Sequence, residues 1–301
     1  MRLPIKLNRA GWPRVFGRLT LTYDDPRILA GDFSALSRHE VSAAISPLRF
    51  GTTFKTTRPK RQKQSDRFLF DLYQGTKPVI LDVGASDGST SLDLIDTLRS
   101  NFRRYYVTDL NISVRCGIAD NGVVYFLDQS GACMLRASKR LLAYSDAQEA
   151  NALLRLITAR MLRRSDRVSR WQDVLLVQPD LTALAANDSR ITITRYDMFT
   201  PWSGERPDVI KIACVLDPLH FSREQIAEAL RVQGSTLAPD GRLLLVGESN
   251  NVEEFSVFRK TSSGLCLEHT QAGGAKAANY VPLSVMNLDS SEAPLQRIVS
   301  A

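Results

Sequence analysis

The chain has 301 residues, of which 44% are hydrophobic, and its net charge at pH 7 is +7. This length predicts one large domain or two modest ones, with enough apolar residues for a sizeable buried core. The four cysteines show no CxxC spacing and the three histidines complete no metal set. We therefore expect no metal site, no disulfide framework and a reducing, cytoplasmic location. No apolar run reaches the ~18 residues of a transmembrane helix, so no membrane partner is expected.

Residues 1–64 show no sustained hydrophobic period, and we interpret them as an irregular N-terminal arm. The first 23 residues carry five basic side chains and no acid, as a transit peptide does. Pro and Gly interrupt any helix there, however, and a secretory apolar core is missing. Basic residues cluster over 55–67 and again over 160–170. Such clusters can neutralise nucleic-acid phosphates, but a solvated surface is the simpler interpretation, so nucleic acid is not the favoured partner.

Helices and buried strands alternate from residue 65 onwards. The apolar run 79–83, interrupted by Asp82, is typical of a strand buried on both faces of a parallel sheet. The elements predicted in this part of the chain are a helix over 65–73, a strand over 79–83, a helix carrying Leu92, Ile95 and Leu98, and a strand over 105–108.

The regular alternation breaks between residues 110 and 190, which we interpret as an insertion. Asn121-Gly122 predicts a hairpin between strands over 113–119 and 123–127. A basic helix is expected from Ser145 through Met161, and residues 174–177 fit a strand or a helix equally. The insertion is a candidate substrate lid or dimer surface.

The C-terminal half returns to alternating elements. They are a strand over 191–194, a buried strand over 208–215, a helix capped by Ser222 and Gln225, a strand over 242–247, and a hairpin of 255–260 with 265–271. Strands that alternate with helices predict a doubly wound, mostly parallel α/β sheet with an antiparallel C-terminal hairpin.

The stretch VILDVGASDGST, residues 79–90, ends a buried strand in a long turn of small residues. In open α/β sheets, ligands bind beyond the carboxyl ends of the strands, and a Gly-rich turn lets a ligand approach the backbone. The turn lacks the GxGxxG pattern of dinucleotide-binding proteins. Its two carboxylates, Asp82 and Asp87, would repel a pyrophosphate, but they suit a ligand that carries an ammonium and a sulfonium.

Residues 82–88 resemble the first motif of class I S-adenosylmethionine-dependent methyltransferases, and the order of motifs over 77–271 is similar to that of this family. The resemblance implies a Rossmann-like methyltransferase fold with a seven-stranded-type sheet and S-adenosyl-L-methionine as cofactor. It gives Asp109 the role of binding the ribose hydroxyls and Asp197 that of meeting the adenine amine. The cofactor-binding residues that it implies are Asp82, Gly84, Ala85, Ser86, Asp87, Gly88, Asp109, Asp197, Met198 and Cys214.

The same resemblance implies an acceptor site after the fourth strand, where Asp217 and His220 are the candidate catalytic residues. A general base helps when the acceptor is a hydroxyl or an ammonium. His220 fits a structural role at the start of the next helix equally well. The apolar neighbours of Cys214 predict a buried core thiol and argue against cytosine chemistry.

The predicted function is transfer of a methyl group to oxygen or nitrogen of a small molecule. Two alternatives stay open: a methyltransferase of RNA or protein that uses the basic segments, and a methyltransferase-fold protein without catalysis that binds or acts as a scaffold. The predicted domains are an arm or lid over 1–64 and a methyltransferase-like domain over 65–301. We expect the arm to close over the acceptor pocket, its basic residues favouring an acidic or phosphorylated acceptor.

Overall fold

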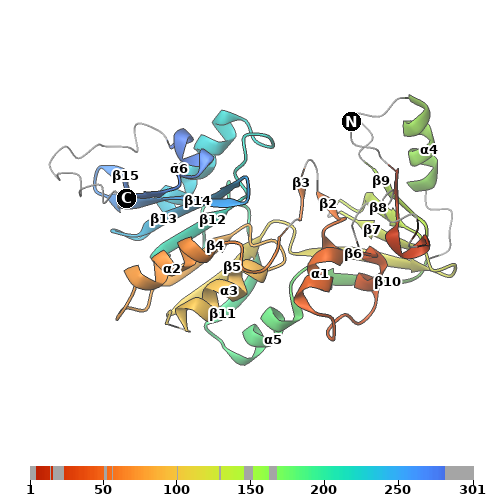
Figure 1. Cartoon of the computed structure of the whole chain (residues 1–301), viewed down its shortest axis with the longest axis horizontal. Coiled ribbons are helices and arrows are strands. Elements are labelled where there is room, and N and C mark those ends of the chain that lie inside the picture. The colour runs from red at the N-terminus through yellow and green to blue at the C-terminus, as the bar shows by residue number, and fades with distance from the viewer. Residues whose placement is uncertain are drawn as a thin grey trace.

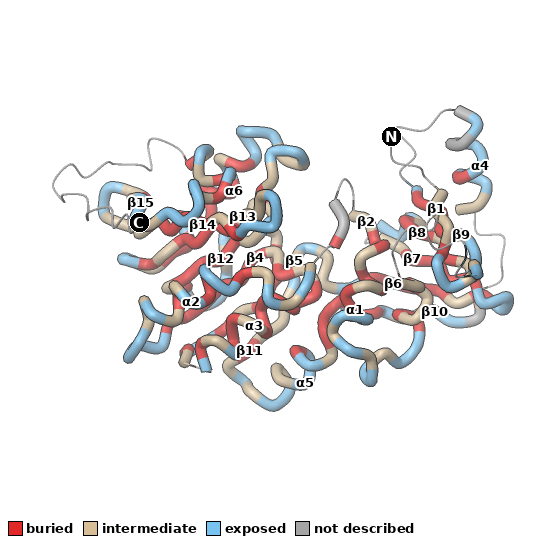
Figure 2. Tube along the Cα trace, viewed as in Figure 1, coloured by how far each residue is buried: buried red, intermediate tan, exposed pale blue. Residues whose placement is uncertain are grey.

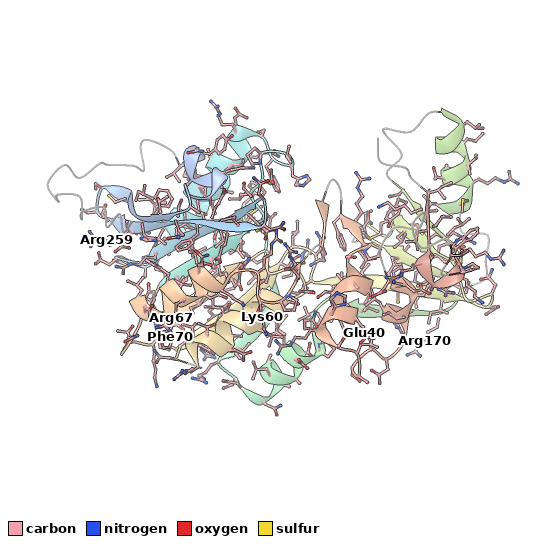
Figure 3. All side chains as sticks on the ribbon, in the orientation of Figure 1. Glu40, Lys60, Arg67, Phe70, Arg170 and Arg259 are labelled. Atoms are coloured by element: carbon pink, nitrogen blue, oxygen red, sulfur yellow. The ribbon has the colours of Figure 1, made fainter. Side chains whose placement is uncertain are left out.

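The computed structural model describes residues 5–13, 15, 24–50, 53–55, 57–99, 101–128, 130–145, 152–162 and 168–281. These residues form two main sheets, one of seven strands and one of six, together with the short hairpin β2 (Arg49–Phe50) and β3 (Thr53–Phe54). Each main sheet lies in its own domain (Figure 1). In Figure 3, Glu40 and Arg170 lie on the smaller domain, and Arg67 and Arg259 lie on the larger one.

The larger domain is built on the seven-stranded sheet. Its strand order is β11 (Ile191–Arg195), β5 (Arg104–Asp109), β4 (Val79–Val83), β12 (Val209–Ala213), β13 (Arg242–Ser249), β14 (Val252–Thr261) and β15 (Gly264–Gln271). The first five strands are parallel, whereas β14 runs antiparallel to both of its neighbours. This mixed, mostly parallel sheet confirms the predicted Rossmann-like α/β fold class and its C-terminal hairpin.

Helices cover both faces of this sheet, which is why its central strands are apolar on both sides. One core joins the sheet to α2 (Lys63–Leu72), α3 (Ser89–Leu98) and α5 (Pro179–Asn187). The other core joins it to α6 (Arg223–Thr236) and η4 (Lys276–Tyr280). All five residues of β4 are buried. The chain passes from β13 to β14 through Asn250 and Asn251, both at positive φ, so no helix separates these two strands.

The smaller domain combines residues from the N-terminal part of the chain with residues of the predicted insertion. The order of its antiparallel sheet is β1 (Ile5–Leu7), β9 (Leu141–Tyr144), β8 (Cys133–Ala137), β7 (Val124–Leu127), β6 (Ser113–Ala119) and β10 (Val168–Leu175). The sheet is accompanied by η1 (Arg9–Gly11), η3 (Pro26–Ala30), α1 (Arg38–Ile45) and α4 (Ala152–Leu162). Leu29, Val41 and Ile45 are buried against Phe126 and Leu135 (Figure 2).

The expectation of an irregular arm is wrong over 38–45, where α1 begins at a capping box made by Ser37 and Glu40. Residues 174–177 contain the end of a strand, because β10 continues to Leu175. Of the helix expected from Ser145, residues 152–161 lie in α4, while 146–151 fall outside the described residues, as do 163–167 of the second basic segment. The predicted division at residue 64 stays a prediction. In space, residues before 50 share a core with residues 114–176.

Candidate functional site

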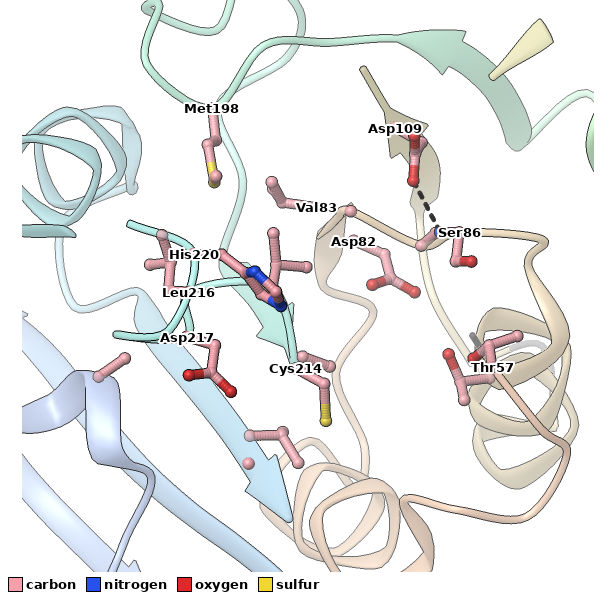
Figure 4. A pocket seen from close by; sticks show the side chains of 18 of the residues that line it. Thr57, Asp82, Val83, Ser86, Asp109, Met198, Cys214, Leu216, Asp217 and His220 are labelled. Atoms are coloured by element: carbon pink, nitrogen blue, oxygen red, sulfur yellow. Dashed lines mark hydrogen bonds between the residues drawn. The ribbon is translucent and has the colours of Figure 1, made fainter. Parts of the chain in front are cut away.

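A cavity of about 540 Å³ lies beyond the carboxyl ends of β4, β5, β11 and β12. Its volume falls in the range of small-molecule sites, about 300–1,000 Å³. The cavity brings together ten of the residues predicted from the sequence, and Figure 4 shows several of their side chains. These ten are Asp82, Gly84, Ala85, Ser86, Asp109, Asp197, Met198, Cys214, Asp217 and His220.

The loop after β4 is held by its own backbone and by the end of β5. Gly84 and Ser86 both have positive φ values, 72° and 60°. A Cβ on Gly84 would lie 2.4 Å from the side chain of Val215, so glycine lets the loop pack against the end of β12. The Ser86 amide donates to Asp109 Oδ2 at 2.9 Å. The Ser86 hydroxyl is buried and has no hydrogen-bond partner among the described residues, which leaves a polar atom at the cavity for a ligand.

Asp82 lies at the bottom of the cavity, and its carboxylate is held by hydrogen bonds from buried side chains. Its Oδ2 accepts hydrogen bonds from Ser91 Oγ at 2.7 Å and from the Tyr105 hydroxyl at 2.9 Å. Lys211 is its partner in register on β12. The Lys211 ammonium, fully buried, donates to Asp66 Oδ1 at 2.8 Å. Asp82, Lys211 and Asp66 therefore form a buried charged layer beneath the cavity.

The pKa values of this layer follow from burial and from neighbouring charge. Burial raises the pKa of Asp66 to about 6, and the Lys211 ammonium opposes that rise. Burial by itself would lower the pKa of Lys211, but the carboxylates of Asp66 and Asp82 raise it above its usual value. Lys211 therefore stays charged at neutral pH.

Asp87 and Gly88, also expected at the cofactor, do not line the cavity. Asp87 is 1% exposed, and its Oδ2 accepts hydrogen bonds from Ser42 Oγ at 2.5 Å and Gln178 Nε2 at 3.0 Å. A Cβ on Gly88 would lie 2.3 Å from Leu181 of α5. Both residues therefore act where the loop meets α1 and α5, on the side that faces the smaller domain.

Asp109 lines the cavity at the end of β5, but it already has a cationic partner. Its Oδ1 lies 3.0 Å from Lys55 Nζ, and the same ammonium donates to the Ser86 carbonyl at 3.1 Å. Oδ1 also accepts from the Asn111 amide at 2.7 Å. The acid expected to bind ribose hydroxyls is thus paired with a lysine from the N-terminal part of the chain.

Other basic residues near the cavity are paired as well. Arg58 Nη2 lies 2.9 Å from Glu248 Oε1, and Arg61 Nε lies 2.5 Å from Glu248 Oε2. Because Lys55, Arg58 and Arg61 all face carboxylates, their presence gives no reason to expect an acidic or phosphorylated acceptor.

Asp197 and Met198 follow β11 on the opposite side of the cavity from Glu248. The Asp197 Oδ1 accepts a hydrogen bond from the Phe199 amide at 3.0 Å, which fixes its carboxylate in a tight turn. The Met198 carbonyl accepts from Gln233 Nε2 of α6 at 2.7 Å. Of the two Asp197 carboxylate oxygens, the turn uses Oδ1.

The segment after β12 forms another wall of the cavity. Cys214 is exposed there, with φ 56°, so the expectation of a buried core thiol is wrong. Although the residue as a whole is exposed, desolvation of the thiol by the cavity wall raises the pKa of Cys214 above its usual value. The thiol therefore stays protonated, which argues against a nucleophilic role. Asp217 Oδ1 accepts from the Leu219 amide at 2.8 Å. The His220 ring points into the cavity, between Leu216 and Cys214 (Figure 4).

No family model matches the chain and no curated protein sequence matches it. Solved structures do match, among them the apo S-adenosylmethionine-dependent methyltransferase SibL. The identity to SibL is 17%, the match covers 62% of this chain and 36% of SibL, and the TM-score is 0.32. A second match is the N-methyltransferase NodS from Bradyrhizobium japonicum WM9 in complex with S-adenosyl-L-homocysteine (13% identity, 68% of this chain, 72% of that chain, TM-score 0.34).

A third match is CalS10 from Micromonospora echinaspora, an amino pentose methyltransferase with S-adenosylmethionine bound (13% identity, 67% of this chain, 63% of that chain, TM-score 0.29). These neighbours are all S-adenosylmethionine-dependent methyltransferases. The chain spans about a third of the length of SibL. Since the identities and TM-scores are low, the function proposed below rests on the residues of the site.

The sequence predicted that the arm over 1–64 closes over the acceptor pocket, and five residues of that part of the chain line the cavity. No site residue was predicted after residue 221. The cavity is also lined by Phe50, Lys55, Thr57, Arg61, Gln62, Glu248, Glu254, Ala275, Lys276 and Ala277. The position of Glu248, directly after the predicted strand 242–247, is a signal that could have found it. The residues around 275 follow the C-terminal hairpin and give no such signal.

A metal site and a membrane-spanning helix, neither of which the sequence predicted, can be sought only among the described residues. There, no group of three or more His, Cys, Asp or Glu side chains could hold a metal ion. None of the described helices is long and apolar enough to cross a membrane.

Proposed function

We propose that the chain is an S-adenosyl-L-methionine-dependent methyltransferase whose acceptor is a small molecule methylated on oxygen or nitrogen. One observation carries this proposal. A single cavity of small-molecule size gathers the loop 84–86, Asp109 and Asp197 from the ends of three parallel strands, beside Asp217 and His220 from a fourth. An acidic set at strand ends is the chemistry that a cationic nucleoside requires.

The donors and acceptors of the cavity fit this cofactor. Carboxylates accept hydrogen bonds from hydroxyl and amine groups, so Asp109 would hold the ribose diol and Asp197 the adenine amine. Asp82, at 2% exposure, would face the positive end of the molecule. The buried Ser86 hydroxyl offers a further hydrogen bond. The exception is Lys55, which already pairs with Asp109.

When bound, the cofactor supplies an activated methyl group on a sulfonium. The role of the protein's own residues would be to orient the cofactor and the acceptor and to remove a proton from the acceptor. The loop and the strand ends would fix the cofactor, while the segment 214–221 would form the wall against which the acceptor is aligned. His220, whose ring points into the cavity, would accept the acceptor's proton, and Asp217 would stabilise the charge that results.

Two observations favour a small acceptor over RNA or protein. The volume of about 540 Å³ suits a cofactor and a small second ligand. Lys55 and Arg61, which line the cavity, and the neighbouring Arg58 are paired with Asp109 and Glu248, so these three cations are not available as a phosphate-binding surface.

Calorimetric titration with S-adenosylhomocysteine tests this function. We expect the native chain to bind it, and Asp197→Asn to weaken binding about tenfold to a hundredfold, because one charge-assisted hydrogen bond contributes ~1.5–3 kcal/mol. Asp71→Asn, the same change on the exposed face of α2, is the matched control and should bind like the native chain. Binding of NAD without binding of S-adenosylhomocysteine would overturn the proposal.

A further inference from the structure

The Lys55 ammonium is buried beside the cavity, where a cation without a partner would be unfavourable. The Lys55 side chain is 6% exposed, and its ammonium sits between Asp109 Oδ1, at 3.0 Å, and the Ser86 carbonyl, at 3.1 Å. Both partners belong to the elements that would hold the cofactor's ribose and methionine parts. Lys55 thus occupies one acceptor position of Asp109 and the Ser86 carbonyl, beside the place where the nucleoside would bind.

The Asp109 carboxylate cannot serve both partners at once. Its Oδ2 accepts from the Ser86 amide, and its Oδ1 accepts from the Asn111 amide as well as from Lys55. A carboxylate offers about four acceptor positions, and three are already in use. Two ribose hydroxyls would therefore have to displace Lys55, the one partner that does not belong to the local backbone.

Lys55 and residues 57–61 are held at two sides of the cavity by ion pairs. Lys55 pairs with Asp109 at the end of β5, while Arg58 and Arg61 pair with Glu248 at the end of β13. The cavity is lined by Lys55, Thr57 and Arg61 between these anchors. The two ion pairs to Glu248 are partly exposed, so they can be broken and remade at a modest cost. The Lys55–Asp109 pair is buried, so its displacement requires that the incoming hydroxyls replace the hydrogen bond of Lys55 to Asp109.

The start of this segment is tied to the smaller domain. Phe50 of β2 packs against the core that contains α1 and β8, and it also lines the cavity. A movement of Lys55 is therefore coupled through the chain to Phe50, which packs against the smaller domain.

We propose that Lys55 and residues 57–61 act as a strap that closes the cofactor site of the free protein, and that nucleoside binding displaces Lys55 from Asp109. This inference rests on the proposed function. The strap and the nucleoside compete for one carboxylate, so each shifts the equilibrium against the other. The strap thereby lowers the affinity for the cofactor and couples its binding to the junction of the two domains.

A supporting role of Lys55 in ligand binding predicts the opposite change in affinity. If Lys55 stays in place and contacts the bound ligand, its removal weakens binding. If it competes, its removal strengthens binding. The sign of the change in affinity therefore decides between a competing strap and a supporting side chain.

The test is calorimetric titration of S-adenosylhomocysteine into the full chain and three variants. We expect Lys55→Gln to bind about threefold to tenfold more tightly than the native chain, about 0.7–1.4 kcal/mol. Lys55→Arg, which keeps the charge, should remain close to native. Lys77→Gln is the matched control, because Lys77 is exposed at the opposite end of β4. Weaker or unchanged binding by Lys55→Gln overturns the strap.

The two proposals fail in different ways. If neither the native chain nor Lys55→Gln binds S-adenosylhomocysteine, the proposed function itself is wrong and the strap has no ligand to exclude. If both bind and Lys55→Gln is not the tighter, only the strap is wrong. Binding by the variant alone would be the strongest form of the expected result.

Limited trypsin digestion of the native chain gives an independent readout. Lys55 is buried, so a displaced strap exposes the bond after it, and we expect cleavage there to accelerate when S-adenosylhomocysteine is added, as peptide mass spectrometry can measure. Slower cleavage with the ligand would mean that the segment closes over it, and the inference would be wrong.

Discussion

Asp87 and Asp109 belong to neighbouring strand ends, yet they serve different parts of the molecule. Asp87 is buried where the loop meets α1 and Gln178, whereas Asp109 faces the cavity and carries Lys55. A pattern of residue types gives the position of a carboxylate along the chain. It does not give the direction in which the side chain points, because that direction depends on the φ and ψ values of a loop in which Ser86 and Gly88 both have positive φ.

His220 is the residue whose removal should separate catalysis from binding. We expect His220→Ala to lower the rate of methyl transfer about 10²- to 10⁴-fold, the usual contribution of a general base. Affinity for S-adenosylhomocysteine should stay within about twofold of native. The measurement is the rate of S-adenosylhomocysteine formation with an acceptor found by screening amines and hydroxyl compounds. His39→Ala, an exposed histidine on α1, is the control. An undiminished rate in His220→Ala would leave this histidine a purely structural residue.

Asp66 should make the stability of the fold depend on pH. Its pKa is raised from 3.8 to about 6 by burial, so the folded state binds a proton more tightly than the unfolded state. Its contribution to stability is fully present below the unfolded pKa, near pH 4, and is lost as the pH rises through 6. At ~1.4 kcal/mol per pKa unit, the loss reaches up to about 3 kcal/mol.

The pH effect is measured by urea unfolding between pH 4.5 and 7.5 in the native chain and in Asp66→Asn. The asparagine can still accept from Lys211 but cannot titrate, so its stability should fall less over this range than that of the native chain. Parallel pH profiles of the two proteins would contradict the raised pKa of Asp66.

At the scale of elements, local signals found those helices and strands whose own residues dictate them. The apolar run of β4 and the strands of the C-terminal hairpin lie where the sequence predicts them. The helix α5 was not predicted at all. It begins with Pro179 at its first position, after Gln178, which makes no side-chain capping bond. Its place is set by packing of Leu181 against the loop after β4, a contact that no local pattern announces.

The capping box of α6 is an element-scale device that can be tested directly. Ser222 Oγ accepts from the Gln225 amide, and Gln225 Oε1 accepts from the Ser222 amide. Ser222→Ala should lower the free energy of unfolding by about 1 kcal/mol. Ser222→Thr keeps the acceptor and should cost less than half as much. Equal losses in both variants, measured by urea unfolding, would show that the hydroxyl does not cap the helix.

At the scale of the whole molecule, the N-terminal residues are part of a core and not only an appendage of the site. Ile45 of α1 is fully buried against residues of the antiparallel sheet. Ile45→Ala should therefore lower the free energy of unfolding by about 2–5 kcal/mol, because it leaves a cavity.

Val15→Ala is the matched control for this prediction. Val15 is 81% exposed in the same part of the chain, so its truncation should change the free energy of unfolding by less than about 0.5 kcal/mol. If Ile45→Ala were equally mild in denaturant unfolding, residues before 50 would be a detachable arm after all.

The sequence by itself determined the fold class, the order of the central strands along the chain and ten of the residues that meet at the cavity. It could do so because a buried parallel sheet demands apolar runs, and because the carboxyl ends of parallel strands share one edge. Only the tertiary structure decided that residues before 50 and residues 113–175 form one antiparallel domain, that Asp87 faces the domain junction, and that Lys55 reaches Asp109. Those contacts join residues 45 to 142 positions apart, and their register is set by packing and charge pairing in space, for which the local sequence carries no period.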